Sequence, residues 1–197
     1  MTVTDFVIYF KKNYFSILPT NKFKYNSHIL FIGFLFLCSF TAITDEYAIK
    51  AQFIERFTRY IEWPSNNEFN NRSKPFIIGI MGESPLYAQL ELLSTKLRIK
   101  DKPIKVKYIE DPSHVEDCHV VFICSSEKKH IAKIVVALKD KPILTISDNE
   151  SFTKYGIMIN MFVENNNIRF IINEAVMDKV GLKASYQLLK LAKKVIN

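Results

Sequence analysis

The stretch of sequence that decides the fold is YAIKAQFIERFTRYIEWP, residues 47–64. Its large apolar side chains recur at helical spacing and predict a single buried stripe, made of Ile49, Phe53, Phe57, Tyr60 and Ile61. The charged residues fall mostly on the other faces, and Glu55 precedes Arg59 by four residues, the favourable order for a helical ion pair. Pro64 disfavours helical geometry at Trp63, so we expect the helix to end there. The stretch therefore predicts an amphipathic helix that packs onto the rest of the domain.

The composition is that of one globular domain. The chain has 197 residues, of which 48% are hydrophobic and 24% charged, enough for one well-filled core. Its five glycines argue against a glycine-rich phosphate-binding loop. The basic residues are spread along the chain, whereas a nucleic-acid-binding protein usually gathers them on one face. Nucleotide and nucleic-acid binding are therefore disfavoured.

The first 44 residues have the order of an export signal. They hold four lysines and one aspartate, followed by the uncharged run ILFIGFLFLCSF at residues 29–40. This run is shorter than the ~20 apolar residues of a membrane span and fits the apolar region of a signal peptide. We expect residues 1–44 to be a signal peptide or N-terminal export segment, with an uncleaved membrane anchor as the alternative. Removal of this segment leaves 23 basic and 19 acidic residues, a net charge of +4.

The remainder alternates apolar runs with helical patterns. Strands are expected at residues 75–81, 103–109, 118–124, 142–147, 156–163 and 168–172. Helices are expected at residues 86–97 and 127–139, from the cap Asn173 to Gly181, and at residues 182–195. This order predicts an α/β fold with a mostly parallel sheet and helices on both faces. The asparagines of residues 164–167 predict a hairpin near the end of the sheet.

No catalytic signature stands out. Residues 79–82 lack the spacing of a dinucleotide fingerprint, and Glu83 would repel a pyrophosphate. Ser147 and Asp148 end a strand, but they lack a nucleophile elbow and an obvious base. Five possible metal ligands have no tight metal-binding spacing: His114, Cys118, His119, Cys124 and His130. We therefore predict no catalytic residue, no metal and no cofactor.

Cys118 and Cys124 are expected to remain unpaired with each other. Six residues of strand separate them by roughly 20 Å, whereas a disulfide needs Cα atoms within about 7 Å. The sequence therefore predicts no disulfide within the mature chain.

The helix end RYIEWP, residues 59–64, resembles the opening helix of the YfiR family. Later segments resemble that family in the same order: FIIGI (76–80), CHVVFI (118–123), ILTISD (143–148), IRFIIN (168–173), GLKAS (181–185) and LLKLA (188–192). The resemblance covers nearly all of residues 46–195. It implies a Rossmann-like three-layer sandwich, which would occupy residues 45–197.

The resemblance also implies a function. Well-known members of the family are periplasmic, often homodimeric, and hold a membrane diguanylate cyclase inactive by binding its sensor domain until an outer-membrane lipoprotein removes them. Cys118 matches a family position, but no cysteine stands where its disulfide partner would be expected, so redox control does not carry over.

Two function classes follow from these observations. The first is a periplasmic repressor of a membrane diguanylate cyclase, and the second is a periplasmic sensor that binds a small ligand. The candidate binding residues are Arg59, Trp63 and Arg169, because two arginines beside an aromatic ring suit an acidic partner loop or a carboxylate. Strand alternation is expected to turn Arg169 toward the face that the first helix covers.

Overall fold

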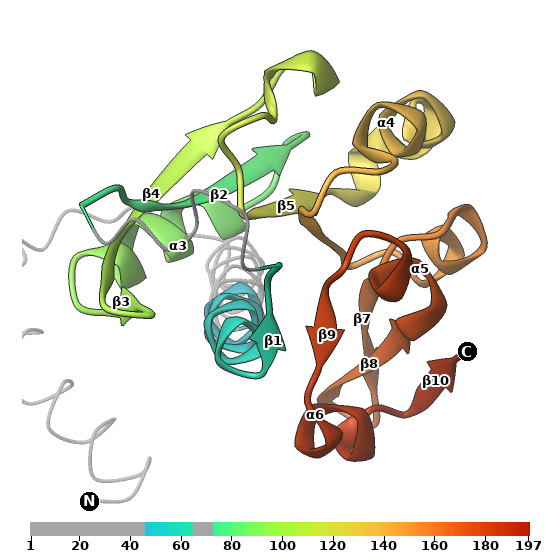
Figure 1. Ribbon diagram of the computed structural model, residues 1–197. Coiled ribbons are helices and arrows are strands. Elements are labelled where there is room, and N and C mark those ends of the chain that lie inside the picture. The colour runs from blue at the N-terminus through green and yellow to red at the C-terminus, as the bar shows by residue number, and fades with distance from the viewer. Residues whose placement is uncertain (1–45, 65–72) are drawn as a thin grey trace, which may run out of the picture. The chain divides into compact units, whose positions relative to one another are not determined.

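The computed structural model describes residues 46–64 and 73–197 (Figure 1). These residues belong to one compact unit. The expected export segment, residues 1–44, lies outside the described residues. Within the described ranges, none of the helices combines the length and the apolar character that crossing a bilayer requires.

A sheet of eight strands forms the centre of this unit. The strands are β2 (Phe76–Met81), β3 (Arg98–Ile99), β4 (Lys102–Tyr108), β5 (Val120–Ile123), β6 (Leu144–Ser147), β7 (Ile159–Glu164), β8 (Asn167–Asn173) and β10 (Lys194–Ile196). They lie in the order β10-β8-β7-β6-β5-β2-β4-β3. The run from β4 to β7 is parallel throughout, whereas β8 is antiparallel to β7 and β3 is antiparallel to β4. The prediction of an α/β fold with a mostly parallel sheet is confirmed.

Helices cover both faces of the sheet. Besides the first helix (residues 46–59), they are α3 (Leu86–Ser94), α4 (Ile131–Leu138), α5 (Glu174–Lys179), α6 (Tyr186–Leu191) and the 3-10 turns η2 (Pro112–His114), η3 (Ser125–Lys129) and η4 (Glu150–Tyr155). Ile78 and Ile80 of β2 pack in one hydrophobic cluster with the first helix, α3 and α6. Ile77 and Met81 pack in a second cluster with α4 and η4. Because alternate residues enter opposite clusters, β2 is buried on both faces and its sequence is continuously apolar.

The first helix faces the core with a different stripe from the predicted one. Ala51, Ile54 and Phe57 are buried, whereas Ile49 is 46% exposed and Tyr60 39% exposed. The helix is thus rotated relative to the prediction, and part of its apolar stripe faces outward. Of the predicted stripe, Phe57 and Ile61 lie in the core, although Ile61 follows the end of the helix.

Lys50 and Glu55 explain the rotation. Both were expected on outer faces, and both are only 4% exposed. Lys50 forms an ion pair with Asp148, and Glu55 forms one with Arg59. Buried charges are tolerated when they are paired and hydrogen-bonded, so these contacts allow two charged side chains to lie on the inner side of the helix.

The helix ends at residue 59, four positions before the predicted end at Trp63. The next residues form β1 (Ile61–Glu62), which pairs antiparallel with β9 (Lys183–Ala184). The helix predicted at residues 182–195 is wrong for the same reason. Its ends are drawn into strands, β9 beside β1 and β10 beside β8, and only α6 between them stays helical.

The hairpin and the cap before α5 are confirmed. Asn165 and Asn166 join β7 to β8 with φ angles of 51° and 58°, the left-handed geometry that tight hairpin turns need and asparagine tolerates. The side chain of Asn173 accepts a hydrogen bond from the backbone N–H of Val176 at 3.2 Å. Local turn and capping chemistry therefore fixed both features.

Candidate functional site

A groove of about 770 Å³ runs along the outer side of the first helix, with α3 and α6 providing its other walls. Figure 1 shows the first helix, in cyan, beside α3. Its apolar lining combines exposed or half-buried side chains with core residues; the former include Phe53, Tyr60, Leu92, Leu97 and Leu191, and the latter include Phe57, Phe170 and Leu188. We call this surface the helix groove. At this surface Tyr60 is exposed, and Phe53 is half-buried against the core.

A second, shallower hollow adjoins the helix groove at Phe53, which lines both. Ile49 of the first helix lies on one side of this hollow, and Val163 and Arg169 of the β7–β8 hairpin lie on the other. The groove and the hollow therefore form one continuous surface on both sides of Phe53.

Arg59 lines the helix groove, as a binding residue should. Its side chain is 62% exposed, and its Nε donates to Glu55 Oε1 at 2.7 Å. This is the ion pair that the sequence predicts. One edge of the guanidinium is held by Glu55, while most of the group remains open to solvent.

Arg169 lines the adjoining hollow, but its side chain does not face the first helix. Its neighbour Phe170 does, with its ring centroid 4.9 Å from that of Phe57. Because successive strand residues leave opposite faces, Arg169 points the other way. Its Nε lies 4.0 Å from Glu164, and its side chain is 53% exposed. The prediction that Arg169 faces the first helix is therefore wrong, because Phe170, the next residue, faces it instead.

Trp63 belongs to the core. It is 9% exposed and packs edge-to-face on Phe76 at a centroid distance of 5.8 Å, with the Lys100 ammonium 5.6 Å from its ring. It lines neither the groove nor the hollow. Arg59 thus lines the helix groove, Arg169 lines the adjoining hollow, and Trp63 lies in the core.

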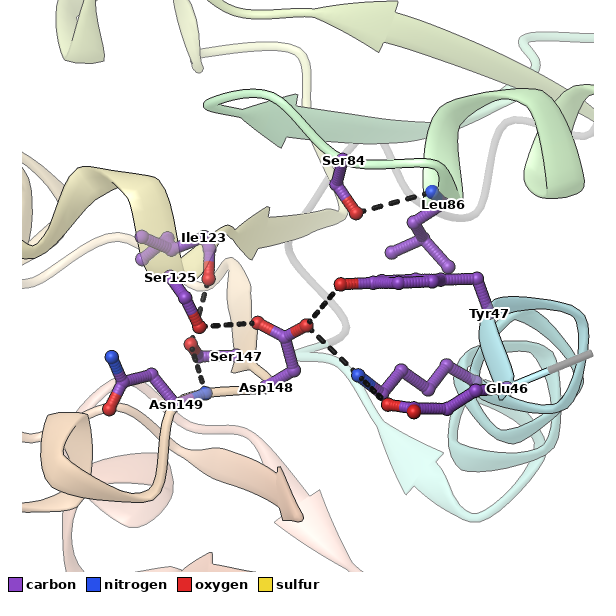
Figure 2. Close-up of polar contacts among 10 residues, drawn as sticks. Glu46, Tyr47, Ser84, Leu86, Ile123, Ser125, Ser147, Asp148 and Asn149 are labelled. Carbon is purple, nitrogen blue, oxygen red and sulfur yellow. Dashed lines mark hydrogen bonds and ion pairs between the residues drawn. The ribbon is translucent and has the colours of Figure 1, made fainter. Parts of the chain in front are cut away.

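A buried polar cluster that sequence reasoning missed is centred on Asp148. Its carboxylate accepts hydrogen bonds from Lys50 Nζ at 3.0 Å, Tyr47 Oη at 3.2 Å and Ser125 Oγ at 3.1 Å (Figure 2). Glu46 lies 2.7 Å from the same lysine ammonium. The cluster joins the start of the first helix to loops that follow β5 and β6.

The position of this cluster is typical of functional sites in parallel sheets. Residues 82–84, 124–126 and 148–149 follow β2, β5 and β6 at the carboxyl edge, and the strand order changes direction between β2 and β5. Ligands of such folds usually bind at this point. Here the first helix occupies it with its own side chains, since Tyr47 and Lys50 satisfy the carboxylate of Asp148.

The electrostatics of the cluster favour the ion pair. Burial by itself would lower the pKa of Lys50, but Glu46 and Asp148 outweigh it and raise the pKa above its ordinary value. Burial, followed by the charge of Asp148, raises the pKa of Tyr47, which keeps its phenol protonated as a donor. Ser147 is not exposed at all, and its hydroxyl donates to the backbone oxygen of Ile123 at 2.7 Å. The ion pair and hydrogen bonds of the cluster therefore hold the first helix against the loops at the carboxyl edge of the sheet.

The five possible metal ligands differ in burial: His114 and His130 are exposed, His119 is half-buried, and Cys118 and Cys124 are buried. Cys118 and Cys124 are free buried thiols, and burial raises their pKa values to about 11 and about 12. Burial, aided by the charge of Lys102, lowers the pKa of His119 to about 4, and its Nδ1 accepts the Ile77 N–H at 3.0 Å. Within residues 46–64 and 73–197, no three His, Cys, Asp or Glu side chains are placed to hold a metal ion.

The sequence profile of the YfiR/HmsC-like family matches residues 47–193. A search of the curated proteins gave no match. Among solved structures, a conserved domain protein from Vibrio cholerae O1 biovar El Tor is similar, with a TM-score of 0.52 at 10% identity over 76% of this chain and 60% of that chain. The ABC domain from Streptococcus pneumoniae in complex with L-Trp has a TM-score of 0.46 at 9% identity, over 61% of this chain and 56% of that one. The likeness to the first concerns the fold alone, and that to the second is too low to carry an argument.

Proposed function

Because this chain belongs to the YfiR/HmsC-like family, we propose that it is a periplasmic regulatory protein in cyclic-di-GMP signalling. In this role it binds the sensor domain of a membrane diguanylate cyclase and represses that enzyme. The degree of repression depends on the fraction of cyclase molecules that it binds. The protein therefore needs a binding surface and no reaction centre. An outer-membrane lipoprotein that removes it from the cyclase completes the scheme.

The observation that carries this proposal is the helix groove with its adjoining hollow. Soluble monomeric proteins rarely leave a large contiguous apolar surface uncovered, and such surfaces commonly mark protein interaction sites. Arg59 and Arg169 lie on this surface and offer planar donors to carboxylates. The polar cluster around Asp148 supports a regulatory role over a catalytic one, since its donors and its carboxylate are bonded to one another.

Three further features belong to the proposal. The run β4-β2-β5-β6 has the strand order of a doubly wound sheet, which fits a Rossmann-like three-layer sandwich extending from residue 45 to residue 197. Residues 1–44 direct export, which N-terminal sequencing of protein from a periplasmic fraction tests. The mature protein is a homodimer, for which sedimentation at several concentrations is the test.

A small-ligand sensor is the second function class. Besides the helix groove and its adjoining hollow, the described residues form an apolar hollow of about 240 Å³ between α4, α5 and η4. Pockets that hold small molecules usually measure about 300–1,000 Å³. This hollow lies below that range, whereas the helix groove lies within it. We favour the partner-binding function because the chain belongs to the YfiR/HmsC-like family, and not on the ground of volume.

Co-expression with a membrane diguanylate cyclase tests the function. Cellular cyclic-di-GMP is expected to fall when the protein is present, and the cyclase is expected to be recovered when the protein is captured from detergent-solubilised membranes. Arg169→Ala is expected to weaken repression with an unchanged melting temperature, because its ion pair with Glu164 is exposed and such pairs contribute at most about 1 kcal/mol to stability. Arg59→Ala is expected to weaken repression as well, but also to lower the melting temperature, because it leaves the buried carboxylate of Glu55 without its partner. Unchanged cyclic-di-GMP together with absence of the cyclase from the captured material would refute the proposal.

A further inference from the structure

We propose that the helix groove docks an acidic amphipathic helix of the partner, an inference that rests on the proposed function and specifies its chemistry. The partner helix would lie along the first helix, with α3 on one side and α6 on the other. Three observations carry this inference: where the exposed apolar side chains are, which charges border them, and how long the groove is.

Exposed apolar side chains gather at this one surface. Ten large apolar residues are exposed in the part of the chain that the structure describes. Four of them line the helix groove: Tyr60, Leu92, Leu97 and Leu191. Two more, Ile49 and Val163, line the adjoining hollow. Six of the ten therefore lie on one surface, although the residues come from four separate stretches of the chain.

The charges along the groove are mainly positive. Its lining includes Arg56, Arg59 and Lys96, with Glu55 as the one acidic residue. Glu55 is buried and already paired with Arg59. Among the described residues, Arg56 and Lys96 have no ion-pair partner. A basic border around an apolar floor is complementary to an amphipathic segment whose polar face is acidic.

The charge pattern also discriminates between occupants. A second copy of this chain, docked groove to groove across a two-fold axis, would bring the same basic border against itself. Residues 1–44 hold four lysines and one aspartate, so that segment lacks the acidic face. A partner with carboxylates on either side of an apolar stripe meets neither objection.

The dimensions suit a helix. The lining runs from Ala48 to Tyr60, about 18 Å along the helix axis at 1.5 Å per residue. A partner helix of three to four turns spans that length and presents apolar residues at spacings of three and four. Walls built from helices on both sides are typical of helix-in-groove recognition.

Peptide binding to the purified full chain tests the inference. The probes are two synthetic helical peptides of about 18 residues that share one leucine stripe, one with glutamates and the other with lysines at its polar positions. We expect the acidic peptide to bind at least about tenfold more tightly, as measured by fluorescence anisotropy. Leu92→Gln is expected to weaken that binding at least about tenfold, and Arg56→Glu combined with Lys96→Glu to abolish or reverse the preference.

Matched controls lie on α4, which packs on the other face of the sheet. Val136 is 73% exposed and Lys133 is exposed as well, so Val136→Gln and Lys133→Glu repeat the same chemical changes away from the groove. They are expected to leave peptide binding unchanged. Melting temperatures within a few degrees of the parent protein confirm that each variant is folded.

Each outcome decides the matter. Equal binding of the two peptides, or binding that Leu92→Gln leaves unchanged, overturns the inference. A loss of self-association in Leu92→Gln without an effect on the acidic peptide also overturns it, because the groove is then an interface between copies. If Leu92→Gln loses peptide binding and still represses the cyclase, the groove is not the cyclase site and the proposed function survives. If the parent protein binds the acidic peptide and does not repress, the proposed function fails instead.

Discussion

Removing the charge of Asp148 is expected to destabilise the domain strongly. Asp148→Asn keeps the shape of the side chain but replaces the Oδ2 acceptor, which Lys50 and Tyr47 share, with either a neutral oxygen or an amide donor. Deletion of one partner from a buried ion pair costs about 3–5 kcal/mol. Lys50 keeps its contact to Glu46 at 2.7 Å, and this reduces the expected cost to about 2–4 kcal/mol. For a domain whose total stability is about 5–15 kcal/mol, that is a large loss.

Urea unfolding followed by circular dichroism at pH 7 measures the effect. Lys50→Met is expected to cost about 3–5 kcal/mol, because Asp148 then retains two hydroxyl donors and no positive charge. The double variant is expected to cost less than the two single variants added together, with a coupling energy of at least about 1 kcal/mol. Lys133→Met is the control, since Lys133 and Asp111 are both exposed and 4.0 Å apart. Two results would show that the cluster does not hold the first helix in place. One is additive effects of the two single variants, and the other is a free energy of unfolding of Asp148→Asn within about 0.5 kcal/mol of that of the parent protein.

Three other predictions concern the core. Phe170→Ala is expected to lower the free energy of unfolding by about 3–5 kcal/mol, because Phe170 is 5% exposed and packs on Phe57; an effect as small as that of the neighbouring variant Arg169→Ala would contradict the packing. The pKa of His119 is lowered to about 4 in the folded protein, so the unfolded chain takes up a proton first as the pH falls. Stability is expected to decrease by about 1.4 kcal/mol per pH unit between pH 6.5 and 4, and His119→Gln, which retains an acceptor for Ile77, is expected to remove this contribution in urea titrations over that range. Cys118 and Cys124 have pKa values of about 11 and about 12, so neither is expected to react with a thiol reagent at pH 8 before unfolding. Non-reduced peptide mapping is expected to yield no link between them, and such a link would mean that β5 is wrongly placed.

Sequence patterns correctly predicted those strands, caps and turns that depend on residues close together in the chain. The apolar runs that became β2 and β5 are buried on both faces, and no alternative structure competes for them. Asn173 and the asparagine turn at residues 165–166 act through bonds a few residues away. The family resemblance added the order of these elements, which single segments do not contain.

The failures all involve partners far away in the chain. Residues 182–195 carry leucines at helical spacing, but β1 and β8 recruit both ends of that segment into strands. Periodicity in the first helix did not distinguish the inner side from the outer, because the inner side includes Lys50, whose partner lies 98 residues later. One signal was available: Asp148 directly follows a buried strand, at an edge where side chains from several loops meet, and Tyr47 and Lys50 are three residues apart on one helical face.

The pairing of β1 with β9 and of the first helix with Asp148 has a consequence for biosynthesis. At roughly 5–20 residues per second, the first helix waits about 5–20 s before β6 and the Asp148 that follows it exist, and β9 and β10 are made later still. During that interval the helix has apolar side chains on two sides, and Lys50 has only Glu46 of the same helix as an ion-pair partner. A nascent chain in this state needs a holding chaperone or an unfolded passage to its compartment. Loss of the last fifteen residues would remove β9, α6 and β10 together, so a shortened chain is expected to remain a client of proteases and never complete the fold.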